Sequence, residues 1–149
     1  MKILPVMKIL IDASPLIAIV DKAQQDNHAK CVEFVHAASG QLLTTLPCFG
    51  EALHILDRMY GWRGQASLWE YVGNGEIAFH FSNADELQRQ RQLMEKYKDR
   101  PMDFADASLV SLAELSGFSK VLTLDDDFFF YLINGRDSFE VFPEREPRR

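Results

Sequence analysis

Residues 8–23 read KILIDASPLIAIVDKA, and the fold class depends on the pattern they contain. The apolar run that begins at Lys8 and ends at Asp12 is typical of a short buried strand. Ser14 and Pro15 follow at once, and serine as N-cap with proline at the first helical position predicts that a helix begins there. We therefore expect a strand that leads directly into a helix, with an acid between them.

The rest of the chain repeats this alternation of strands and helices. Further strands are expected at 41–45, 76–81, 120–124 and 138–142. Helices are expected from an Asn27 cap to Ala38 before Gly40, from Pro47 to a break near Gly61, and at 65–72. Two more are expected from a Ser82 or Asn83 cap to about Lys98 and from Asp103 to Leu115 before Gly117. A turn or short helix is expected in 128–133. Short apolar strands alternating with helices predict a single α/β domain, with a central parallel sheet of about four or five strands flanked by helices on both faces.

Length and composition are those of one soluble globular domain. The chain has 149 residues, of which 47% are hydrophobic and 26% charged. Its apolar runs are too short to cross a bilayer and its start is too short for a signal peptide, so we expect a cytoplasmic protein with no membrane association. Cys31 and Cys48 have no metal-ligand spacing and are expected to be reduced, buried thiols.

The two ends of the chain are set apart from the predicted domain. The segment MKIL occurs at Met1 and again at Met7, and only the second copy runs into a strand pattern. We treat residues 1–6 as an N-terminal extension and residues 7–142 as the domain. Residues 143–149, PEREPRR, form a charged C-terminal tail that is expected to be frayed.

The net charge of −6 argues mildly against nucleic-acid binding, which usually needs a basic surface. Four carboxylates bound to metal would reduce this charge to about −2 over the rest of the chain. The acidic balance therefore weakens a nucleic-acid hypothesis without removing it.

Two acids lie next to predicted helix starts. Asp12 follows the first strand, and in open α/β sheets ligands bind beyond the carboxyl ends of the strands. The alternative is an aspartate that caps the helix together with Ser14. Glu51 follows Gly50 in the first turns of a helix, where glycine is easier to explain if a backbone or ligand approaches closely. The alternative for Glu51 is an acid that interacts favourably with the helix N-terminus.

Two further acidic positions are more informative. On a helix, Asp106 shares a stripe with Leu109, Val110 and Ala113, so its carboxylate lies in line with the apolar face. The alternative makes Asp103 the N-cap and Asp106 a first-turn acid, and both interpretations can hold together. Asp125, Asp126 and Asp127 follow a buried strand. In an extended segment residues 125 and 127 point to the side that Thr123 also faces, whereas a turn and a cap would need only one aspartate.

Together these acids predict a metal site. Carboxylates gathered without a positive partner favour Mg²⁺ or Mn²⁺, which support phosphodiester hydrolysis by activating water. Phosphate-binding glycine loops and a nucleophile elbow are missing from the sequence. Of the four histidines only His54, one turn after Glu51, is a candidate neighbour of the site. Arg58, Arg63 and Arg100 are candidate phosphate contacts, although solvated surface charge is their default interpretation.

Four short segments, taken in order, resemble the PIN domain family, and within it the VapC-type toxins of toxin–antitoxin pairs. They are ILIDASPLIA, TTLPCFGEALHIL, MDFADASLVSLAE and VLTLDDDF, and they span most of residues 7–142. The resemblance implies a Mg²⁺- or Mn²⁺-dependent ribonuclease that is usually dimeric and inhibited by an antitoxin protein. It makes Asp12, Glu51, Asp106 and Asp125 the four catalytic acids, with Asp12, Asp106 and Asp125 as metal ligands. Asp103, Asp127 and Thr123 resemble accessory positions, and the run of aspartates leaves open whether Asp125 or Asp127 contacts metal.

The leading hypothesis is therefore a metal-dependent endoribonuclease with RNA as substrate, an antitoxin partner and a homodimeric state. The first alternative is an interaction protein with little turnover, which would use Phe128–Ile133 and the helix near Trp62 and Trp69 as a docking surface. The second is a phospho-acceptor receiver domain. A receiver would want a paired acid beside Asp12 and a lysine after a later strand, and the sequence has neither.

Overall fold

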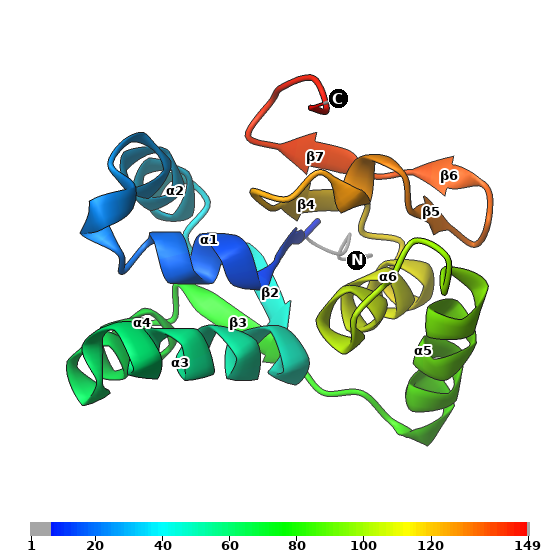
Figure 1. The fold of residues 1–149 in the computed structure, drawn as a ribbon, viewed down its shortest axis with the longest axis horizontal. Helices are drawn as coiled ribbons and strands as arrows, with labels where there is room; N and C mark the ends of the chain where they lie inside the picture. Colours follow the sequence, from blue (N-terminus) through cyan, green and yellow to red (C-terminus); the bar gives the residue numbers. More distant parts are fainter. Residues whose placement is uncertain (1–6, 149) are drawn as a thin grey trace, which may run out of the picture.

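The computed structural model describes residues 7–148, so the predicted extension at residues 1–6 lies outside the described residues. The strands are β1 (Ile9–Ile11), β2 (Leu42–Thr45), β3 (Ile77–His80), β4 (Lys120–Leu122), β5 (Leu132–Ile133), β6 (Asp137–Ser138) and β7 (Glu140–Phe142). The helices are α1 (Ala13–Ala18), α2 (Asp26–Ala37), α3 (Leu46–Tyr60), α4 (Trp62–Gly73), α5 (Ala84–Lys96) and α6 (Phe104–Ser116), with 3₁₀ turns η1 (Lys22–Gln24) and η2 (Asp127–Phe129). The expected α/β alternation is confirmed (Figure 1).

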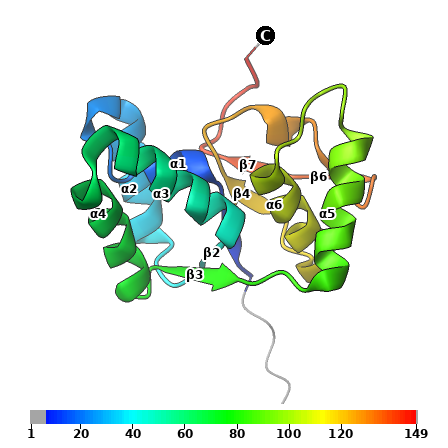
Figure 2. The same ribbon diagram turned by 60° about the horizontal axis from the view of Figure 1, so that its bottom comes forward.

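The central sheet has five parallel strands in the order β3-β2-β1-β4-β7. From β1 the chain moves outward through β2 to β3 and then returns to β4 on the other side of β1. Parallel crossovers are right-handed, so connections that run in opposite directions along a sheet place their helices on opposite faces. Figure 2 shows this result, with α1–α4 on one side of the sheet and α5 and α6 on the other. The order reverses between β1 and β4, and ligands of open α/β sheets bind in the crevice outside the carboxyl ends of the strands at such a point.

The starts of three helices differ from the predictions. The helix α4 begins at Trp62, directly after Gly61, and not at residue 65. The N-cap of α1 is Asp12, whose side chain accepts a hydrogen bond from the backbone N–H of Ala13, so α1 begins before the predicted Ser14 cap. The helix α2 follows Gln25, which has a φ of 54° and makes no side-chain cap, and Asn27 lies inside the helix. None of these differences moves an acid of the predicted site.

The helices that carry Glu51 and Asp106 start and end close to the predicted positions. The side chain of Thr45 caps α3 by accepting from the N–H of Cys48, and Gly61 ends that helix. Asp103 caps α6 and Gly117, with a φ of 78°, ends it in the left-handed conformation that glycine adopts at low cost. Asn83 caps α5 in a capping box with Glu86.

The segment after β4 is less regular than predicted. The strand ends at Leu122, so Thr123 and the aspartates belong to a loop that leads into η2. The expected short element at 128–133 forms η2 and β5, and β5 pairs with β6 in a small antiparallel hairpin. Phe128, Tyr131 and Ile133 are buried, so most of this segment packs into the core and is not available as the docking surface of the first alternative. Phe130, Trp62 and Trp69 are exposed, as that alternative expects.

The core lies against both faces of the sheet and includes the inner strands and most of α6. Leu10, Ile11, Val121 and Leu122 have no exposed surface, as expected for strands covered on both sides. Cys31 and Cys48 are buried free thiols, as predicted. Within residues 7–148 no helix is long and apolar enough to span a membrane.

Candidate active site

Asp12 lies at the carboxyl end of the central strand β1, and its carboxylate is almost fully buried. Oδ1 accepts from the N–H of Ala13 at 2.7 Å, and Oδ2 accepts from the hydroxyl of Thr123 at 2.8 Å. The capping role and the site role therefore occur together in one residue. Ser14 accepts from the N–H of Leu124 at 3.0 Å and so ties α1 to the segment after β4.

Thr123 connects Asp12 to the loop that carries the three aspartates. Its hydroxyl is buried, donates to Asp12 and accepts from the N–H of Asp125 at 3.1 Å. The negative charge of Asp125 raises the pKa of Asp12, so the two carboxylates are close enough to repel each other. Thr123 therefore links the two carboxylate-bearing segments through its hydroxyl group.

Asp106 and Asp103 lie at the N-terminal end of α6. The N–H of Asp106 donates to Oδ1 of Asp103 at 2.7 Å, which is the predicted cap. Asp106 itself is 7% exposed, and its Oδ2 accepts from the hydroxyl of Tyr131 at 2.9 Å. The expected carboxylate on a buried helix face is therefore present.

Glu51 is exposed, unlike Asp12 and Asp106, and lies on α3 at the rim of the same site. It lines a cavity of about 230 Å³ together with Pro47, Asp103, Phe104 and Ala105. Its pKa is raised by partial burial and then by the charges of Asp103 and Asp125, so Glu51 faces the other acids. At the neighbouring Gly50, no described atom lies within 4 Å of where a Cβ would stand, so the expected close approach of backbone is wrong.

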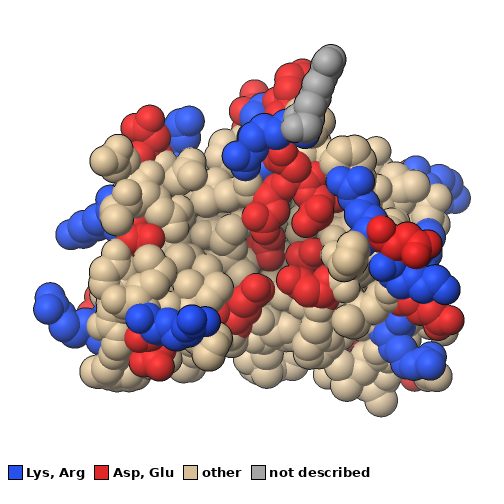
Figure 3. Space-filling view, viewed as in Figure 1, with Lys and Arg blue, Asp and Glu red and all other residues tan. Residues whose placement is uncertain are grey.

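The acids form one strongly negative region. Burial raises the pKa of Asp12 to about 7, with Asp125 the next largest cause. Burial also raises the pKa of Asp106, and the charges of Asp12 and Asp103 add to it. Asp127 contributes to the raised pKa of both Asp106 and Asp125. Figure 3 shows acidic side chains gathered in a band down the middle of the molecule, with most lysines and arginines toward the outside.

Asp126 differs from Asp125 and Asp127 because its carboxylate is bound by the C-terminal tail. Its carboxylate pairs with Arg145 and Arg148, and these contacts hold its pKa below the ordinary value. Burial and then the charges of Asp127 and Asp103 raise the pKa of Asp125, so Asp125 and Asp127 lie near the other acids. They do so from a loop and a 3₁₀ turn, and not from the extended segment that the sequence predicted. The tail is not frayed as expected, because residues 145 and 148 pack against this loop.

Two neighbours of the acids, Tyr131 and Cys48, were not predicted from the sequence. Tyr131 lies in an apolar run without any polar signal, and it reaches Asp106 only through the turn at η2. The Cys48 thiol points toward Oδ1 of Asp12 at 3.9 Å and the carbonyl of Ala105 at 3.6 Å. Burial and the Asp12 charge raise the pKa of Cys48 well above its usual range, so it stays a neutral thiol. Ser14 was predicted, but as a cap.

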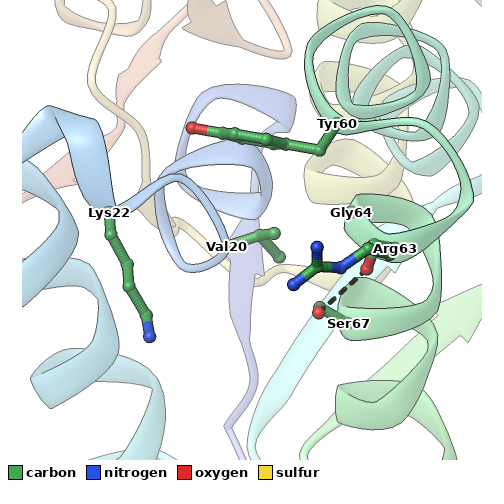
Figure 4. Close-up of a pocket in the computed structure, with 6 residues that line it drawn as sticks. All are labelled: Val20, Lys22, Tyr60, Arg63, Gly64 and Ser67. Carbon is green, nitrogen blue, oxygen red and sulfur yellow. Dashed lines mark hydrogen bonds between the residues drawn. The ribbon is translucent and has the colours of Figure 1, made fainter.

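The predicted basic contacts lie outside the acid cavity. Arg63 lines a separate cavity of about 410 Å³ with Val20, Lys22, Tyr60, Gly64 and Ser67 (Figure 4). Arg100 stacks over the ring of Phe130, 3.8 Å from its centroid. Arg58 and His54 are exposed on α3. Among the described residues, the lining of the acid cavity includes none of these basic side chains.

The donor chemistry fits a hard divalent cation. Within residues 7–148, no group of three or more His, Cys, Asp or Glu side chains is arranged so that all of them could hold one ion. Mg²⁺ usually keeps several waters and takes only one or two protein carboxylates, so a full protein cage is not required. Asp12 and Asp106 offer carboxylate oxygens in a buried region where negative charge is already unfavourable. A divalent cation would relieve that repulsion.

Comparisons with known proteins agree with this arrangement. The family model of the PIN domain matches residues 9–131. Ribonuclease VapC26 of Mycobacterium tuberculosis is 27% identical over 135 residues, which cover 90% of this chain and 99% of the relative.

Two solved structures share the fold. The crystal structure of Mycobacterium tuberculosis VapC20, a Sarcin-Ricin loop cleaving toxin, superposes with a TM-score of 0.72 at 18% identity and covers 80% of this chain and 92% of that one. The DNA-bound VapBC of Salmonella typhimurium gives 0.65 at 12% identity, covering 91% and 98%. With the family model matched over most of the chain and the acids gathered at the reversal point of the sheet, the chain belongs to the PIN domain family.

Proposed function

We propose that this protein is a Mg²⁺- or Mn²⁺-dependent endoribonuclease that cleaves RNA phosphodiester bonds. The observation that carries the proposal is the pair of buried carboxylates, Asp12 and Asp106, which burial and neighbouring negative charge hold at a raised pKa. Isolated buried carboxylates are costly, and proteins keep them where they are paired or bind a metal. Their position beside the carboxyl ends of β1 and β4 is where an α/β sheet binds ligands.

Each acid has a proposed role. Asp12 and Asp106 would be the main ligands of the ion, and Asp125 and Glu51 would complete the site directly or through water. When bound, the ion would lower the pKa of water and stabilise charge that develops on the phosphate. Thr123 orients Asp12 by donating to Oδ2, and Tyr131 orients Asp106 in the same way. Asp103 keeps the α6 N-terminus in place, and Asp127 adds negative charge beside Asp106 and Asp125.

We further propose that the protein is the toxin of a toxin–antitoxin pair and acts in the cytoplasm, where its RNA would be. The names of the relatives support this, since they describe a ribonuclease, a toxin that cleaves an RNA loop, and a VapBC complex. The interaction-protein alternative is less well supported, because Phe128 and Tyr131 of its proposed surface are buried.

A homodimer remains a prediction. Exposed apolar side chains next to the acid cavity would suit a second copy, and they are Leu46, Phe81, Leu87 and Phe104. Light scattering at several concentrations tests the oligomeric state.

The test is cleavage of labelled RNA with Mg²⁺ or Mn²⁺, with and without EDTA, by the parent and by Asp12→Asn and Asp106→Asn. We expect the parent to cut only with metal and both variants to lose most activity. Asp57→Asn is the matched control, since Asp57 is an exposed acid on α3 and lies outside the acid cavity. Cleavage by both site variants at the parent rate would show that the assignment is wrong.

A further inference from the structure

The tail that follows β7 holds the loop that follows β4. Arg145 donates from Nη2 to the backbone carbonyl of Asp125 at 2.8 Å and contacts Oδ1 of Asp126 from Nε and Nη2 at 3.4 Å. Nη1 of Arg145 donates to the carbonyl of Pro143 at 2.9 Å, which ties the guanidinium to its own tail. Its side chain is only 23% exposed, so this is an ordered contact and not a solvated surface charge.

Arg148 and Phe129 extend the same contact. The backbone N–H of Arg148 donates to Oδ2 of Asp126 at 2.8 Å, so both carboxylate oxygens of Asp126 are occupied by the tail. The guanidinium carbon of Arg145 lies 5.3 Å from the centroid of the Phe129 ring, within the range of a cation–π contact. The loop from residue 125 to residue 129 is therefore held at three points by one arginine.

These contacts decide which way each aspartate faces. With the carbonyl of Asp125 and the carboxylate of Asp126 bound to the tail, the carboxylate of Asp125 lies close enough to Asp12 for its charge to raise the pKa of Asp12, while the charge of Arg145 lowers the pKa of Asp125 itself. The N–H of Asp125 completes the arrangement by donating to Thr123, which in turn donates to Asp12. Without the tail, the mutual repulsion of the acids would favour a loop that swings its carboxylates outward into water.

We infer that Arg145 is a positioning residue, which sets the metal-binding direction of Asp125 by fixing the backbone of residues 125 and 126. The inference rests on the proposed metal-dependent function. Arginine suits this role because its planar fork bonds a carbonyl and a carboxylate at once, whereas lysine presents a single compact charge.

The direction in which Arg145→Ala changes the affinity for a divalent cation distinguishes a positioning role from a purely electrostatic one. Arg145 is a cation close to an acidic region, so removing it makes the region more negative. If only charge mattered, Arg145→Ala would bind a divalent cation more tightly. If Arg145 positions Asp125, the same variant binds the cation more weakly. Partners that orient metal ligands typically change metal affinity by about 10- to 100-fold.

The experiment measures Mn²⁺ binding to the full chain by titration calorimetry, without RNA, with unfolding curves recorded for every variant. We expect Arg145→Ala to weaken Mn²⁺ binding by about tenfold and Arg145→Lys to fall between it and the parent. Arg148→Ala is the charge-matched control, because it removes the same charge from an 80% exposed side chain and keeps the backbone N–H that bonds Asp126. It should bind Mn²⁺ as tightly as the parent or slightly more tightly.

Equal or tighter Mn²⁺ binding by Arg145→Ala would overturn the inference, and so would an equal loss in Arg148→Ala. If Arg145→Ala does not fold, Arg145→Lys decides, since parent affinity in that variant would also overturn it. If the parent binds Mn²⁺ but cuts no RNA, the nuclease proposal is contradicted. The role of Arg145 is then still tested by comparing the Mn²⁺ affinities of the parent and the arginine variants. A parent that binds no Mn²⁺ would overturn both.

Discussion

Asp12→Asn should stabilise the metal-free protein while it abolishes cleavage. Burial, followed by the charge of Asp125, raises the pKa of Asp12 in the folded chain from the ordinary value of 3.8 to about 7. A carboxyl group whose folded pKa is raised favours folding at low pH, and this contribution is lost as pH rises from the unfolded value through the folded value. Ionised Asp12 therefore destabilises the folded state at neutral and higher pH.

The size of this change in the free energy of unfolding follows from the pKa shift of Asp12. The rise from 3.8 to about 7 corresponds to about 4 kcal/mol over the whole window, of which about 3 kcal/mol falls between about pH 5 and pH 8. Asparagine can still accept the capping hydrogen bond from Ala13, because asparagine and aspartate are comparable N-caps. It cannot ionise, and it also removes one of the charges that raise the pKa of Asp106.

The assay is urea unfolding of EDTA-treated parent and Asp12→Asn at several pH values, followed by circular dichroism. The free energy of unfolding of the variant should exceed that of the parent by an amount that grows by about 3 kcal/mol from about pH 5 to pH 8. Added Mn²⁺ should stabilise the parent, most at high pH, and should have little effect on the variant. The exposed-acid control Asp57→Asn should show no such trend. A difference between variant and parent that does not change with pH would refute the reasoning.

Three further predictions concern Tyr131, Thr123 and the core. Tyr131→Phe removes the hydrogen bond that lowers the pKa of Asp106. The rising limb of the pH profile of metal-dependent cleavage should therefore move to higher pH, and the free energy of unfolding should fall by about 1 kcal/mol. An unchanged pH profile would contradict this prediction. Thr123→Val keeps the shape but removes the hydroxyl that donates to Asp12, so calorimetry should show Mn²⁺ binding weakened by about tenfold, and parent affinity would argue against its orienting role. Leu109→Ala at a fully buried position should cost about 2–5 kcal/mol in urea unfolding and leave Mn²⁺ affinity unchanged while the protein is folded; a parallel loss of affinity would show that core and site are not separable.

Local patterns in the sequence were enough to predict the alternation of elements and the acids at their ends. Apolar runs bounded by turn residues specify buried strands, and Pro47 and Asp103 indicate where α3 and α6 begin, because these preferences act over a few neighbouring residues. Asp106 could be placed on a buried face because helical spacing alone relates it to Leu109 and Ala113. The predicted Ser14 cap was wrong because Asp12, two residues earlier, competes for the same local role.

The tertiary structure alone decided which of these residues meet. The strand order places the ends of β1 and β4 side by side, although Asp12 and Thr123 are 111 residues apart. Tyr131 reaches Asp106 and Arg145 reaches Asp126 through contacts that span 25 and 19 residues, and neither contact leaves a local pattern. Residue type and spacing along the chain therefore determined which acids could serve a metal site. The burial of Asp12 and Asp106, the raised pKa values and the position of Asp125 arise from packing between distant segments, which brings like charges together and removes two of the carboxylates from water.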